Sequence, residues 1–182
     1  MSRMLDWLEK NGVLLCNQNP ELPALEDLGC TWREAMELVD AHQVFYCKAY
    51  KKRTTYLSQE AYYLLKAVKP SRPPPPSAQA LLGVLAENPE ADTAFLKTAS
   101  GLLAKEFRAG LDFLLENLLA TAVAKGRDLN ANWSQLRYGT AKEWERLAGA
   151  FPIETDRTRA RERLWALVSG VMTERQFGAL AR

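Results

Sequence analysis

The stretch that decides the fold is Leu25-Glu-Asp-Leu-Gly-Cys-Thr-Trp-Arg-Glu-Ala-Met-Glu-Leu-Val39, followed by Lys51-Lys-Arg-Thr-Thr-Tyr-Leu-Ser-Gln-Glu-Ala-Tyr-Tyr-Leu-Leu65. Thr31 and Glu34 form a capping box, in which the threonine oxygen accepts from a backbone amide and the glutamate reaches back to the cap amide. A helix is therefore predicted from Trp32 to about His42. A short helix that starts at Pro23 and ends at Gly29 precedes it, so the pair predicts a helix-turn-helix.

A β-hairpin is predicted after this helix pair. Residues 44–50 and 54–57 are rich in β-branched and aromatic side chains, with the basic tip Lys51-Lys-Arg53 between them. Ser58 then caps a helix over 59–68, where apolar residues recur at helical spacing. On the other side, a helix ending near residue 11 and a brief strand at 13–16 come before the helix pair.

This order of elements resembles the winged-helix DNA-binding domains of bacterial transcription regulators. The resemblance covers residues 1–69 and rests on element order and patterning. It implies that the helix after the turn enters the major groove of double-stranded DNA and that the hairpin, the wing, touches the neighbouring backbone. Carried over to this sequence, it implies DNA contacts from Trp32, Arg33, Gln43, Lys48, Lys51, Lys52, Arg53 and Thr54.

A run of prolines divides the chain. Lys69-Pro-Ser-Arg-Pro-Pro-Pro-Pro-Ser77 excludes a helix interior or a central strand and favours an extended spacer. Proline runs also recruit aromatic-groove modules in some proteins, but a stiff linker is the preferred interpretation. We therefore predict a winged-helix domain over 1–69, a linker over 70–77 and a second domain over 78–182, with no internal repeat.

The second domain is expected to be an all-helical bundle, which makes the predicted fold class mainly α with one small hairpin. Ser77 caps a helix through Ala86. Apolar residues three or four apart then predict one long helix over 93–125, bent at its glycines. Later helices are predicted to begin near Thr140, Thr155 and Thr173.

Composition narrows the classes of function. The net charge is +2, so no global field marks a polyanion binder and any electrostatic function must be local. One histidine excludes a multi-histidine zinc site, and three cysteines without a C-x-x-C pair are typical of buried thiols in a reducing cytosol. With no phosphate loop or nucleophile motif, we expect no enzyme, no cofactor, no metal and no membrane segment, and a cytoplasmic location.

Structural explanations compete for several of these residues. A charged hairpin tip also keeps a sheet edge from pairing with other chains, so both interpretations of residues 51–53 stay open. Packing is the simplest explanation for Trp32 and His42. The tyrosines of the first half could form a surface on which single-stranded nucleic acid stacks, but packing explains them more simply. The arginines of residues 157–163 are best explained as an ion-paired, solvated face with Glu154, Asp156 and Glu162.

Two hypotheses of function remain. The leading one is a small DNA-binding transcription regulator whose helical half supplies dimerisation or a partner surface. However, the expected groove helix carries three acidic residues, Glu34, Glu37 and Asp40, and a single basic residue, Arg33. Its net negative charge repels phosphate. The alternative is therefore a winged-helix protein-interaction module, an adaptor or an inhibitor of a nucleic-acid-processing machine, that does not touch DNA.

Overall fold

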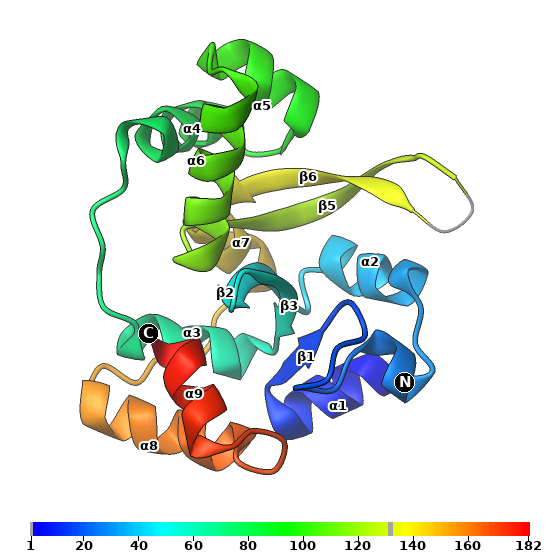
Figure 1. Cartoon of the computed structure of the whole chain (residues 1–182), viewed down its shortest axis with the longest axis vertical. Helices are drawn as coiled ribbons and strands as arrows, with labels where there is room; N and C mark the ends of the chain where they lie inside the picture. Colours follow the sequence, from blue (N-terminus) through cyan, green and yellow to red (C-terminus); the bar gives the residue numbers. More distant parts are fainter. Residues whose placement is uncertain (1, 131–132) are drawn as a thin grey trace.

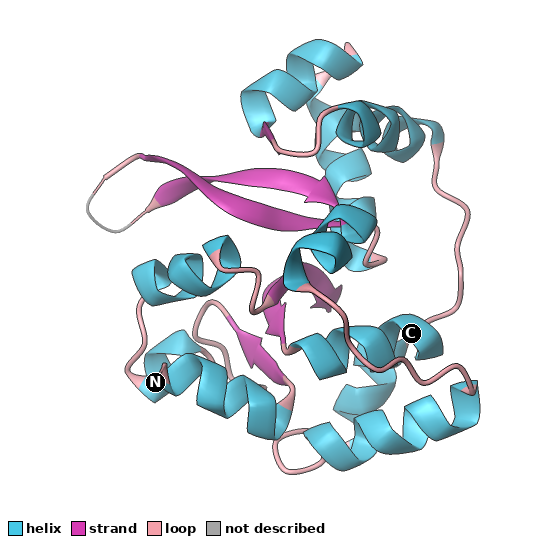
Figure 2. Ribbon diagram, turned by 180° about the vertical axis from the view of Figure 1, so that it is seen from behind, coloured by secondary structure: helices cyan, strands magenta, loops and turns pink. Residues whose placement is uncertain are grey.

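The computed structural model describes residues 2–130 and 133–182. The described chain contains two three-stranded antiparallel sheets with helices packed around them, and the β-hairpin of the second sheet extends beyond the helices (Figures 1 and 2). The predicted mainly α fold is therefore wrong, and the fold is mixed α/β. The error lies in the second half of the chain, where strands form in place of part of the expected helical bundle.

The first half follows the predicted order of elements. The Thr31 capping box forms, with the Glu34 amide donating to Thr31 Oγ1 at 3.3 Å and the Thr31 amide donating to Glu34 Oε2 at 2.6 Å. The helix before the turn is a single 3-10 turn. The elements are α1 (Arg3–Asn11), β1 (Val13–Leu15), η1 (Leu25–Leu28), α2 (Trp32–Asp40), β2 (Phe45–Tyr50), β3 (Arg53–Leu57) and α3 (Gln59–Val68).

The predicted hairpin is confirmed. β2 pairs antiparallel with β3, and β1 joins the other edge of β3, which gives the strand order β1-β3-β2. The tip consists of Lys51 and Lys52, which have backbone φ angles of 47° and 60°. Positive φ at both central residues is the geometry of a tight two-residue hairpin turn, which asparagine and glycine adopt more readily than lysine.

The proline segment lies between α3 and α4. Residues 70–75 form neither helix nor strand and run along one side of the molecule (Figure 1). Pro76 begins α4 (Pro76–Glu87), because the first turn of a helix needs no N–H from proline. The helix predicted from Ser77 therefore forms and takes in the last two residues of the expected linker, but the predicted cap is wrong, because Pro75 is the N-cap and Ser77 lies inside the first turn.

The long helix predicted over 93–125 is wrong. Gly101, with a φ of 66°, ends one helix, and Leu118, with a φ of 57°, turns the chain from the next helix into a strand. The second sheet has the order β4-β6-β5. Its elements and their neighbours are β4 (Ala91–Asp92), α5 (Thr93–Ser100), α6 (Ala104–Glu116), β5 (Ala120–Asp128), β6 (Ser134–Thr140) and α7 (Ala141–Ala148).

Two further helices, α8 (Arg157–Val168) and α9 (Glu174–Ala181), pack against the first half. α8 lies on α3, and α9 lies on β2. Arg159 and Arg163 lie 3.9 Å from Glu154, so the predicted ion pairs with this glutamate form. The segment 130–134, predicted to lead into a helix, instead follows β5, which ends at Asp128, and its last residue, Ser134, begins β6. Residues 131–132 of that prediction lie outside the described residues.

The second half repeats the order of elements of the first, a structural repeat that is not visible in the sequence. Residues 3–68, the first unit, and residues 76–148, the second unit, both run helix, strand, helix, helix, hairpin, helix, and the last strand is central in both sheets. Local geometry repeats too. His42 and Leu118, each second after its helix, share a φ of 57°, and Ser58 and Thr140 cap the helices after the hairpins.

The two units pack on each other reciprocally. α2 lies on β5, α6 lies on β2, and β2 crosses β5. At the crossing, the buried hydroxyl of Thr121 accepts from the Tyr46 amide at 3.0 Å and donates to the Tyr46 carbonyl at 2.7 Å. His42 Nε2 lies 2.8 Å from the Val123 carbonyl, so the predicted packed histidine joins the two units.

An aromatic cluster fills the contact between the units. Trp144 of α7 is fully buried; its ring lies 5.0 Å from those of Phe45 and Tyr62, and its Nε1 donates to the Val44 carbonyl at 3.1 Å. The tyrosines of the first half are likewise buried, which explains them by packing.

Both hydrophobic cores contain residues from the two sides of the proline segment. The three cysteines are buried and free, as predicted.

Candidate functional site

The tip of the first hairpin faces a cavity of about 780 Å³. Seven of its fourteen lining residues are lysine or arginine and two are glutamate, whereas the whole chain carries a net charge of only +2. Positive charge is therefore concentrated at this cavity. A chain with a near-neutral net charge can have an electrostatic binding site only through such a local concentration. We call this cavity the basic groove, and its cations are Lys48, Lys51, Lys52, Lys69, Arg72, Arg175 and Arg182.

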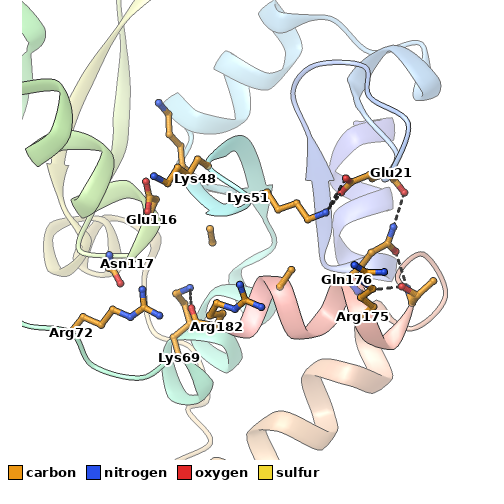
Figure 3. Close-up of a pocket in the computed structure, with 14 residues that line it drawn as sticks. Glu21, Lys48, Lys51, Lys69, Arg72, Glu116, Asn117, Arg175, Gln176 and Arg182 are labelled. Atoms are coloured by element: carbon orange, nitrogen blue, oxygen red, sulfur yellow. Dashed lines mark hydrogen bonds and ion pairs between the residues drawn. The ribbon is translucent and has the colours of Figure 1, made fainter. Parts of the chain in front are cut away.

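Three separate parts of the chain build the basic groove. The hairpin tip lies on one side, the segment after α3 brings Lys69 and Arg72, and α9 brings Arg175 with Arg182 just past its end. Figure 3 shows the side chains of Lys69, Arg72 and Arg182 gathered at one end of the cavity. Folding, rather than any one stretch of sequence, creates this concentration of charge.

Neighbouring carboxylates engage two of the lysines. Lys51 Nζ lies 2.9 Å from Glu21, whose carboxylate also accepts from the Tyr50 hydroxyl at 2.5 Å. The Tyr50 hydrogen bond, and then the one from Lys51, lower the pKa of Glu21, so this carboxylate is held ionised. Lys48 Nζ pairs with Asp112 of α6 at 2.7 Å. Both pairs orient the hairpin and leave other cations to meet a ligand.

The remaining cations of the groove are not neutralised. Lys52, Arg72 and Arg175 are exposed and have no ion pair or side-chain hydrogen bond within residues 2–130 and 133–182. Lys69 Nζ donates to the Arg182 carbonyl at 2.7 Å. Burial lowers the pKa of Lys69. Cys47 and Glu116 act in the opposite direction, and Arg72 acts in the same direction as burial. The exposed Lys52, Arg72 and Arg175 are the cations that a bound anion would neutralise.

A second hollow of about 660 Å³ lies on α6 and shares lining residues with the basic groove. We call the two hollows together the basic surface. Lys52 lines both hollows and so connects them. Lys105 and Arg108 contribute to the second hollow from the exposed side of α6, together with the partly exposed Asp112 and Glu116. The basic surface therefore joins the hairpin tip of the first unit to a helix of the second unit.

Trp32 and Arg33 lie elsewhere, at the start of α2. Trp32 Nε1 donates to Ser134 Oγ at 3.3 Å, and the Trp32 ring lies 5.1 Å from that of Trp133. The second hairpin thus packs on the beginning of the helix that was expected to read DNA. Packing therefore explains Trp32, although its partner is the second hairpin and not the first. Arg33, the next residue, is exposed.

The other predicted contacts are also dispersed. Gln43 lines a third cavity, near α3 and α7, and Arg53 is exposed at the start of β3. Thr54 is half-buried, and its carbonyl accepts from the Cys16 amide at 3.0 Å. Of the eight predicted residues, Lys48, Lys51 and Lys52 line the basic groove, while Trp32 and Arg33 line a different cavity.

Six cations of the basic surface were not among the predicted contacts: Lys69, Arg72, Lys105, Arg108, Arg175 and Arg182. They come from three segments, and none forms a basic run of its own in the sequence. Only the tip Lys51-Lys-Arg53 carried a local signal. An expectation that the chain folds back on that tip would have been needed to find the others.

The described part of the chain has no group of three or more His, Cys, Asp or Glu side chains that could hold a metal ion. Within the same residues, the helices are too short or too polar to cross a bilayer. Comparison with protein-family models, curated protein sequences and solved structures finds no match for this chain.

Proposed function

We propose that this chain is a small DNA-binding regulator that holds the phosphate backbone of double-stranded DNA in the basic groove. The observation that carries the proposal is the gathering of seven cations, several of them unpaired, around one cavity. Exposed lysine and arginine side chains on a continuous surface suit a chain of phosphates, because each contact releases a counterion.

The element order of the first unit supports double-stranded DNA in particular. It is the order from which the resemblance to winged-helix domains was drawn, and the basic hairpin tip lines the groove. The strained turn at Lys51 and Lys52 adds support, because positive φ at lysine is costly and strain of this kind concentrates at functional sites. The dimerisation role first expected of a helical bundle is not part of this proposal, since that bundle does not form.

Salt titration of duplex binding tests the proposal. Within the described residues, five cations of the two hollows have no ion pair: Lys52, Arg72, Lys105, Arg108 and Arg175. The logarithm of the binding constant should therefore fall with the logarithm of salt concentration at a slope of about −4.5. The double variant Lys52→Ala/Arg175→Ala should bind more weakly, with a slope shallower by about 2. Fluorescence anisotropy with a labelled random-sequence duplex measures both quantities.

A matched control removes the same charge from other surfaces. Lys10 and Lys142 are exposed and line neither hollow, so the Lys10→Ala/Lys142→Ala variant should keep the wild-type slope. Equal losses in the two double variants would show a diffuse charge effect and contradict the groove. No binding at low salt would contradict DNA binding altogether and favour the protein-interaction alternative.

A further inference from the structure

The internal repeat makes α6 the structural equivalent of α2. Both helices follow a shorter helical element, precede a hairpin and are followed by a residue with a φ of 57°. The next amides also match, because Gln43 donates to the Leu38 carbonyl and Leu119 to the Leu114 carbonyl. Counting back from the helix ends at Asp40 and Glu116 places Arg108 where α2 has Trp32.

The two equivalent helices differ in accessibility. The second hairpin is the longer, with β5 of nine residues against six for β2, and its far end reaches the beginning of α2. The first hairpin turns back at Lys51 and Lys52, beside α6. Consequently Trp32 packs against Trp133, whereas Arg108 is exposed in the open hollow next to Lys52.

The exposed side of α6 has the chemistry of a base-reading surface. Its first half presents Lys105 and Arg108 to the hollow together with the exposed small residues Ala104 and Ala109. The exposed Glu106 does not line this hollow, and its carboxylate accepts from the Leu103 amide at 3.1 Å. Neither cation has an ion pair or hydrogen bond within the described residues. The exposed residues of α2 are Arg33, Glu37 and Asp40, so α2 presents one cation and two carboxylates.

Packing holds α6 firmly in this position. A Cβ at Gly110 would lie 3.0 Å from the Ser77 carbonyl carbon and 3.1 Å from the Ala78 amide, so α6 and α4 approach closely at this point. On another side, the ion pair between Asp112 and Lys48 fixes α6 to the first hairpin. A helix held on two sides can present its free face to a ligand without reorganising.

We infer that α6, rather than α2, enters the major groove, with Arg108 and Lys105 contacting guanine edges while Lys52 holds the adjacent phosphate. The inference rests on the proposed function and names the residues that would give it sequence preference. Arginine and lysine pair with O6 and N7 of guanine, and no other base pair presents that pattern.

Selection from a random-sequence duplex pool tests the inference. The wild type should enrich a preferred sequence containing guanine, and Arg108→Ala should lose about 10- to 100-fold of its discrimination between that sequence and one with the guanine replaced. Lys52→Ala should weaken binding to both duplexes equally. Arg33→Ala on α2 serves as the matched control and should keep the wild-type preference.

The outcomes separate the two proposals. Wild-type protein that fails to bind any duplex overturns the proposed function and this inference together. Binding without sequence preference, an unchanged preference in Arg108→Ala, or a loss of preference in Arg33→Ala overturns the role of α6 alone. Circular dichroism of each variant confirms that the helices are retained, as expected for alanine at exposed helical positions.

Discussion

The two hairpins of this molecule have the same place in the repeat but different surroundings. The first is short, and its lysine tip lies beside a basic cavity. The second is longer and packs across the start of α2, where Trp32 meets Trp133. The difference teaches that hairpin length decides which helix of the partner unit stays accessible: the short hairpin leaves α6 open, and the long one covers α2.

The contacts beneath the hairpins differ as well. Where α6 lies on β2, Asp112 pairs with Lys48. The equivalent position in α2 is Met36, which is completely buried. A side-chain ion pair therefore joins α6 to β2, whereas α2 is joined to β5 by Asp40, which accepts from the Lys125 amide at 2.8 Å. The following predictions probe this difference from the largest effect to the smallest.

Trp144→Ala should have the largest effect on stability. The substitution empties a fully buried site between the units and removes the hydrogen bond to Val44, so the free energy of unfolding should fall by about 4 kcal/mol. Urea denaturation followed by circular dichroism measures the loss. Trp133→Ala is the control. Trp133 lies on the second hairpin and is half-exposed, so its substitution should lower the free energy of unfolding by about 1 kcal/mol or less. Similar losses would show that the aromatic cluster does not hold the units together.

Thr121→Val should come second. Valine keeps the shape of the side chain but leaves the Tyr46 amide and carbonyl without partners at the crossing of the units, which should cost about 2 to 3 kcal/mol. Thr55→Val is the control within one hairpin. Thr55 is equally buried but its hydroxyl makes one bond, to the Arg53 carbonyl, so about 1 kcal/mol is expected. A smaller loss at Thr121 than at Thr55 would contradict the importance of the crossing.

The ion pair between Lys48 and Asp112 should contribute less. Both side chains are partly exposed, so a double-mutant cycle with Lys48→Met and Asp112→Asn should give a coupling energy of about 0.5 kcal/mol. The coupling should shrink as salt is added, because the pair is screened. A coupling that is independent of salt would show that packing, not charge, joins α6 to the first hairpin.

Acidification should have the smallest effect. The pKa of Glu21 is lowered, chiefly by the Tyr50 hydrogen bond, so the unfolded chain binds a proton to this group more readily than the folded chain does. Its contribution to stability is present above the ordinary pKa of 4.5 and disappears as the pH falls through the lowered value. The stability difference between wild type and Glu21→Gln should therefore shrink from about pH 7 to about pH 3. A constant difference would exclude the carboxylate as its source.

The first unit could be predicted from sequence because its boundaries carry local signals. The Thr31 capping box and the caps at Gly12 and Ser58 each fix the end of an element within a few residues. The hairpin was likewise marked by aromatic strands on both sides of a basic tip.

The second sheet could not be predicted, because β5 continues the apolar spacing of α6 without a glycine or proline between them. Ala120, Ala122 and Ala124 favour helix locally, yet pairing with β6 and burial against the first unit make them a strand. Leu118, in a left-handed conformation uncommon for leucine, makes the turn without any signal in its residue type. The basic groove was missed for a related reason, since tertiary contacts alone bring its segments together.

The reciprocal packing of α2 on β5 and α6 on β2 has the form of an isologous homodimer contained in one polypeptide. In a true homodimer every mutation appears on both protomers, so a surface cannot become cationic on one side and acidic on the other. Within one polypeptide that constraint does not apply, and the two units are free to differ. Arg108 of α6 stands where α2 has Trp32, so the two faces of the molecule present different side chains to a partner.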